Sequence, residues 1–151
     1  GPWTEEYRAD SKGRVDAYFT RDYNMVQPGR QHVGVQGGFL VLRPDQKAYD
    51  EYVDIITEGD FDGGWGGKYG GFYGAMQFQG VVPYYYDTFH PRTAVELNRC
   101  RYNTMADNPM NVRGDQGEGK CRDSRETCED CRKTDPADVY TAHFTVGQKP
   151  W

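Results

Sequence analysis

The sequence has no long apolar segment and no excess of positive charge, and each absence excludes a broad class of protein. No apolar run approaches the roughly 20 residues that a helix needs to cross a bilayer. The net charge of -5 disfavours a nucleic-acid-binding protein, because a surface that follows a phosphate backbone is normally basic. A local basic site for a small phosphate stays compatible with this charge.

The N-terminus shows neither a methionine nor a signal peptide. The chain begins with Gly1-Pro2, so we expect it to be processed, tagged or a fragment, with any membrane anchor outside it. Aromatic residues make up 15% of the 151 residues, which argues against disorder. The 19 glycines and eight prolines predict one loop-rich domain over residues 1–151.

Cysteine is scarce, and all four cysteines lie in the last third of the chain: Cys100, Cys121, Cys128 and Cys131. They could form disulfides or a zinc site, and only the last two have the close spacing of a zinc knuckle. We favour disulfides, which suit the lumen of the secretory pathway, such as the Golgi, or the extracellular space. Four cysteines allow three pairings, and the sequence does not choose among them. Residues 108–133 form a polar, Cys-rich loop insert.

Hydrophobic patterning predicts an α/β fold. A short strand is expected at 15–20, and the continuous apolar run 33–42 predicts a strand buried on both faces. Pro44-Asp45 then opens a helix that stops at Gly59. Its expected apolar face consists of Ala48, Tyr49, Tyr52, Val53, Ile55 and Ile56.

Shorter elements follow the helix. Residues 81–86 are a short strand or helix end, and residues 95–103 form another short element. Residues 135–137 predict a turn or a single helical turn, and 139–144 a final strand. The glycine-rich stretch 59–80 also contains aromatic residues, which favour a ligand-binding loop over a flexible linker. The aromatics expected to shape a pocket are Trp65, Tyr69, Phe72 and Tyr73.

The C-terminal segment has the residue types of a metal–diphosphate site. His143, at the end of the expected strand, can bind a divalent metal. Gly147 lets the backbone approach an anion, and Lys149 supplies a positive charge for phosphate. The alternative is a structural histidine and a solvated lysine, and spacing alone leaves both open.

These residues also carry a resemblance to a known family. His143-Phe144, Gly147 and Lys149-Pro150-Trp151 resemble the pattern H-F-x-G-x-x-K-P-W of glycosyltransferase family 8, the glycogenin and galactinol-synthase relatives, with one residue fewer between Gly and Lys. The resemblance implies the C-terminal part of a GT-A type fold, with a mixed sheet and flanking helices. It also implies a UDP-sugar donor, Mn²⁺ or Mg²⁺ held by His143, and a diphosphate held by Gly147 and Lys149.

Weaker matches extend the resemblance through the middle of the chain. Gln36-Gly37-Gly38 resembles the family's N-S-G and is a candidate donor-binding segment. Phe61–Gly64 resembles F-D-G-G, Phe78–Pro83 resembles D-Q-G-L-L-N, and Leu97–Asn103 resembles L-P-x-x-Y-N. Asp62 and Gln79 are the candidate catalytic residues.

Three departures qualify the expected function. Phe78 replaces the Asp of D-Q-G, Gln36 replaces the Asn of N-S-G, and no D-x-D follows an apolar strand. We interpret Asp60-Phe61-Asp62, which follows the helix, as a coincidental match. The nucleotide-binding half is therefore expected before Gly1 or on another chain.

The sequence supports three hypotheses. The first is a metal-dependent, retaining transferase that moves a sugar from a UDP-sugar to a carbohydrate or protein acceptor, without nucleic acid. The second is a catalytically inactive, glycosyltransferase-like structural or carbohydrate-binding module. The third is a small zinc-binding domain.

Overall fold

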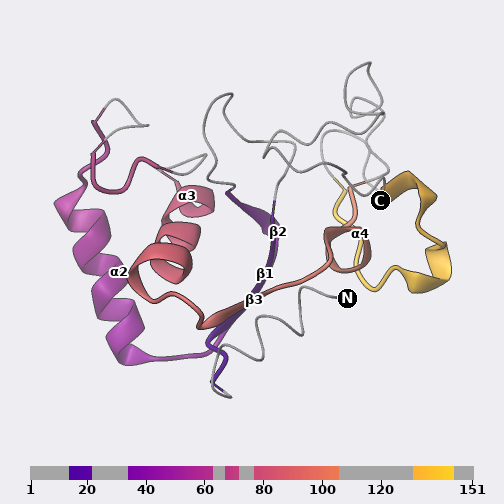
Figure 1. The fold of residues 1–151 in the computed structure, drawn as a ribbon, viewed down its shortest axis with the longest axis horizontal. Helices are drawn as coiled ribbons and strands as arrows, with labels where there is room; N and C mark the ends of the chain where they lie inside the picture. Colours follow the sequence, from indigo (N-terminus) through magenta and orange to yellow (C-terminus); the bar gives the residue numbers. More distant parts are fainter. Residues whose placement is uncertain (1–13, 22–33, 63–66, 72–76, 106–130, 145–151) are drawn as a thin grey trace.

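A computed structural model describes residues 14–21, 34–62, 67–71, 77–105 and 131–144, and it shows a mixed sheet with flanking helices (Figure 1). The central strand, β1 (Ala17–Arg21), pairs antiparallel with β2 (Val35–Leu42) and parallel with β3 (Ala94–Glu96). The sheet order is therefore β2-β1-β3. The expected α/β class is confirmed for the described residues, and none of their helices is long and apolar enough to cross a bilayer.

The strand β2 is less buried than its apolar sequence predicts. Val35 and Gln36 are buried, but Val41 and Leu42 are 50% and 41% exposed. The prediction of a strand buried on both faces is therefore wrong for most of its length. β2 lies at one edge of the described sheet, and a continuous apolar run carries no alternation that shows which face is covered.

The helix α2 (Gln46–Glu58) begins and ends as the sequence predicts. The Asp45 carboxylate accepts a hydrogen bond from the Ala48 N–H at 3.0 Å. Gly59 ends the helix in the left-handed conformation, at φ 61°.

The apolar face of α2 divides into two stripes. Ala48, Tyr52 and Ile55 pack on the core, whereas Tyr49, Val53 and Ile56 are exposed. The single apolar face expected from the sequence is therefore wrong for the second stripe. The two stripes have the same spacing and are offset by one residue, so the sequence pattern could not separate them.

A second helical layer lies between α2 and the sheet (Figure 1). It comprises α3 (Phe78–Pro83) and a π-helical turn, η2 (Tyr84–Phe89). Pro83 has no N–H to continue the α-helical pattern, and the wider turn begins directly after it. Of the two expectations for residues 81–86, the helical one is confirmed.

Three consecutive tyrosines of η2 join three parts of the fold. Tyr85 stacks on Tyr52 of α2, with ring centroids 4.3 Å apart. Tyr86 lies against Phe19 of β1, and Tyr84 meets Tyr69 edge to face at 4.7 Å. These rings fill the core between α2 and the sheet.

Tyr69 corrects one expectation about the glycine-rich stretch. It is only 2% exposed and also packs on Phe61, so it belongs to the core and does not line a ligand pocket. Gly67, at φ 70°, fits this turn because a Cβ there would lie 2.8 Å from the Asp60 carbonyl carbon. Trp65, Phe72 and Tyr73 lie outside the described residues.

A buried ion network joins the central strand β1 and the edge strand β3 to the helical layer. Arg21 of β1 contacts Glu96 of β3 at 3.3 Å and Asp87 of η2 at 2.6 Å. The side chains of Arg21 and Glu96 are each 8% exposed. Buried charges of this kind are tolerated because they are paired.

A disulfide, an isolated β-bridge and several backbone hydrogen bonds attach residues 131–144 to α4 and the residues that follow it. Cys100 of α4 (Arg99–Tyr102) is bonded to Cys131, the first residue of the 3-10 turn η4 (Cys131–Lys133). The preference for disulfides is confirmed for this pair, so a zinc site built on all four thiols is wrong. Cys121 and Cys128 lie outside the described residues.

Residues 136–144 form less regular structure than the sequence predicts. The expected helical turn is present as η5 (Pro136–Asp138), capped by Asp135. The final strand expected at 139–144 is wrong, because the structure has only an isolated parallel bridge between Thr104 and Ala142. Three of its six residues are exposed and the other three are half-buried, so the apolar pattern is not used to build a sheet.

Candidate functional site

The start of β2 contacts the histidine of the C-terminal motif. A Cβ on Gly38 would lie 2.6 Å from Cε1 and 2.7 Å from Cγ of His143, so the imidazole occupies the space of the missing side chain. The His143 N–H donates to the Thr104 carbonyl at 2.8 Å, beside the Thr104–Ala142 bridge. Backbone pairing therefore holds the histidine over the glycine.

The His143 ring has one nitrogen without a partner. Nδ1 is buried, and no residue that the structure describes makes a hydrogen bond to it. A buried ring nitrogen without a partner costs free energy, and an ion or a catalytic role is among the explanations for such an atom in a native protein. This atom is the main chemical reason to treat the contact with Gly38 as a candidate site.

The Gln36 side chain is fixed beside this contact. Its Oε1 accepts hydrogen bonds from the Gly38 N–H and from Asn103 Nδ2, the latter at 3.0 Å. The Asn103 amide also donates to Thr20 Oγ1 at 2.9 Å. Gln36, Asn103 and Thr20 are all buried, so β1, β2 and the end of α4 are connected at one point.

The N-terminal end of α3 completes the cluster. A Cβ on Gly37 would touch the Phe78 ring at 3.4 Å and Gln79 Cγ at 3.7 Å. Phe78 is 47% exposed and Gln79 is half-buried. An aromatic face and an amide thus stand next to the same backbone segment that contacts His143.

Five of the sequence-predicted site residues meet along β2: Gln36, Gly37 and Gly38 lie within the strand, Gln79 lies against Gly37, and His143 lies against Gly38. Asp62 is exposed just beyond α2 and takes no part in these contacts. Gly147 and Lys149 lie outside the described residues. The sequence did not predict a role for Asn103. The only sequence feature that pointed to this residue is its position in the segment Leu97–Asn103, which resembles L-P-x-x-Y-N.

The residues fit a divalent metal in part. His143 offers an imidazole, a common metal ligand, with its unpaired Nδ1 as the unexplained atom. Among the residues that the structure describes, no three His, Cys, Asp or Glu side chains gather around one point. The further ligands of such a metal would be diphosphate oxygens and residues outside these ranges.

Comparisons with family models, with curated proteins and with solved structures found no match. The assignment of a function therefore depends on the residues of this chain and on their arrangement.

Proposed function

We propose that this chain is the C-terminal part of a GT-A type glycosyltransferase domain that transfers a sugar from a UDP-sugar to an acceptor hydroxyl. The proposal rests on the contacts that Gln36–Gly38, at the start of β2, make with Gln79 and His143. Gln36–Gly38, Gln79 and His143 come from three separate segments, and each segment resembles a different block of glycosyltransferase family 8. The contacts of Gln79 and His143 with adjacent residues of β2 support one common site.

Each residue has a distinct role in the proposed mechanism. His143 would hold Mn²⁺ or Mg²⁺, and Gly147 and Lys149 would bind the diphosphate beside it. A bound divalent cation acts as a Lewis acid that neutralises charge on the departing UDP. Lys149 would add a fixed positive charge to the same leaving group.

The remaining residues would position the sugar. Gly38 leaves room for the imidazole, and the Gln36 amide is held by Asn103 so that its orientation is fixed. Gln79 would hydrogen-bond a sugar hydroxyl, while the exposed Phe78 ring would offer an apolar face to the sugar. Transfer would retain the anomeric configuration, as in the family.

Calorimetry on the full-length protein tests this role of His143. UDP binding should depend on Mn²⁺ and be greatly weakened by His143→Ala, because the variant lacks the imidazole ligand. Asp54→Asn, an exposed change on α2, is the control and should bind as the wild type does. Unchanged Mn²⁺-dependent binding in the histidine variant would contradict the proposal.

A second candidate is a glycosyltransferase-derived module that binds carbohydrate without catalysis. Phe78 favours it, because an exposed aromatic ring stands where the family has an aspartate near the transferred sugar. Hydrolysis or transfer of a UDP-sugar in the presence of Mn²⁺ would exclude this module. Carbohydrate binding without turnover would support it.

A further inference from the structure

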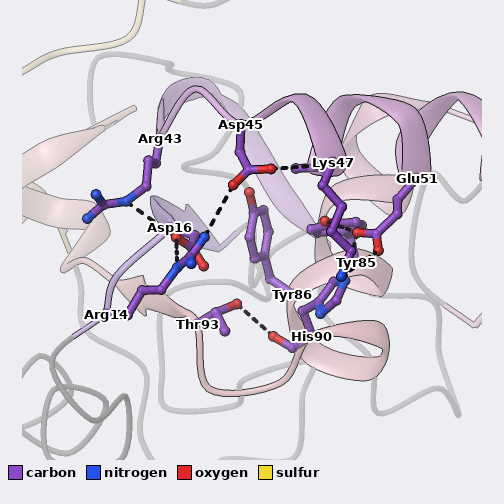
Figure 2. A pocket seen from close by; sticks show the side chains of 11 residues that line it. Arg14, Asp16, Arg43, Asp45, Lys47, Glu51, Tyr85, Tyr86, His90 and Thr93 are labelled. Carbon is purple, nitrogen blue, oxygen red and sulfur yellow. Dashed lines mark hydrogen bonds and ion pairs between the residues drawn. The ribbon is translucent and has the colours of Figure 1, made fainter.

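A cavity lined by charged side chains and tyrosines lies at the other end of the β1–β2 pair. Its volume is about 350 Å³, at the lower end of the range of small-molecule pockets. It is bounded by the residues before β1, the residues after β2, the first turns of α2 and the turn that follows η2 (Figure 2). Gly38 and Arg43 are five residues apart on an extended strand, which is about 17 Å. The cavity is therefore separate from the proposed transfer site.

The charges around the cavity are balanced. The basic side chains are Arg14, Arg43 and Lys47, and the acidic ones are Asp16, Asp45 and Glu51. Arg14 bonds Asp16 at 2.8 Å and Asp45 at 3.3 Å, so most of the charge is neutralised locally. The acidic and basic side chains around the cavity are equal in number, so their formal charges sum to zero and favour neither an anion nor a cation.

One wall of the cavity contains the Glu51 carboxylate, a hydrogen-bond acceptor that Tyr85 and His90 hold in place. Glu51 Oε2 accepts the Tyr85 hydroxyl and is 2.8 Å from His90 Nε2. These hydrogen bonds, that of Tyr85 first, hold the pKa of Glu51 below its usual value, so the carboxylate stays ionised. Its other oxygen, Oε1, is 3.6 Å from the Lys47 ammonium and keeps free acceptor capacity.

The cavity also combines donors with an aromatic wall. Lys47 and Arg14 have side chains that are 77% and 64% exposed and carry several N–H donors. Tyr86 lies between the Arg14–Asp16 side and the His90 side, as Figure 2 shows. A sugar ring presents hydroxyl groups that both donate and accept, together with apolar C–H faces.

We propose that this cavity binds one ring of a neutral, polyhydroxylated ligand, that is, an uncharged sugar unit. The carboxylates of Glu51 and Asp45 accept hydroxyl hydrogens, Lys47 and Arg14 donate to hydroxyl oxygens, and the tyrosine wall covers one apolar face. This site is independent of the proposed transfer reaction, because it shares no residue with the contact set around Gly38.

Titration calorimetry and ligand-observed NMR on the intact protein test the site. The probes are glucose, galactose, mannose and xylose, with gluconate, glucosamine and inorganic phosphate as charged comparisons. At least one neutral sugar should bind saturably, with a dissociation constant near 1 mM, a value typical of weak ligands at about -4 kcal/mol. Saturable binding of the charged probes alone, or of no probe, would overturn the proposal.

Variants then locate the binding. Lys47→Ala should weaken it about fivefold, the effect of one lost hydrogen bond, without loss of fold because alanine favours helix. Glu51→Gln should weaken it at least as much. The control Asp54→Asn, and His143→Ala at the other site, should leave sugar affinity unchanged. If Lys47→Ala, Glu51→Gln and the wild type bind the sugar with equal affinity, the sugar does not bind in this cavity. That outcome would contradict the proposed location regardless of the result for UDP binding.

Discussion

Replacement of Gly38 by alanine should destabilise the protein through His143. The new Cβ would lie 2.6–2.7 Å from two ring atoms, whereas unstrained carbon contacts need about 3.5–4.0 Å, so the ring must move by about 1 Å. The His143 backbone is held by its hydrogen bond to Thr104. Overpacking of this kind costs about 1–3 kcal/mol. We expect the free energy of unfolding to fall by that amount.

The adjacent glycine provides a matched control. A Cβ on Gly37 would meet Phe78 at 3.4 Å, which is an ordinary contact, so Gly37→Ala should change the stability much less. Urea denaturation of both variants measures the difference. The double variant Gly38→Ala/His143→Ala removes the clash and should be more stable than additivity predicts, by about 0.5–3 kcal/mol. Equal stabilities of the two alanine variants, together with strict additivity, would refute the contact.

Three further predictions concern stability. Replacing both Cys100 and Cys131 by serine should lower the free energy of unfolding by about 3–4 kcal/mol, because the disulfide closes a loop with a sequence separation of 31; a loss below 1 kcal/mol in denaturant titrations would count against this bond. Glu96→Ala should lower the free energy of unfolding by about 3–5 kcal/mol, because it removes a partner of the buried Arg21. Asp138→Ala, in the exposed pair with Arg101, should lower it by less than about 1 kcal/mol. Similar losses of stability for the two variants in thermal unfolding would contradict the reasoning. Because hydrogen bonds from Tyr85 and His90 lower the pKa of Glu51 in the fold, its stabilisation should be complete above the unfolded value of about 4.3 and be lost as the pH falls through the lower folded pKa. Glu51→Gln should flatten that part of the pH–stability curve, and an unchanged curve would argue against the effect.

The sequence by itself determined the local elements with clear end signals. Asp45 and Gly59 mark the two ends of α2, since a side-chain acceptor satisfies free N–H groups and glycine adopts the left-handed turn at little cost. Asp135-Pro136 likewise marked a helical turn, because its signal is contained within three residues. Cysteine usage favoured disulfides over a zinc site, and the structure confirmed this for Cys100 and Cys131.

Only the tertiary structure determined which residues pack against one another. It paired Cys100 with Cys131, placed Tyr69 in the core, and left one apolar stripe of α2 exposed. The sequence named Gly38 and His143 separately, but their contact spans more than one hundred positions and depends on the pairing of Thr104 with Ala142. Side-chain chemistry and local hydrogen bonds can be read along the chain. Long-range packing depends on how all the elements compete for the same core, and no local pattern records the result.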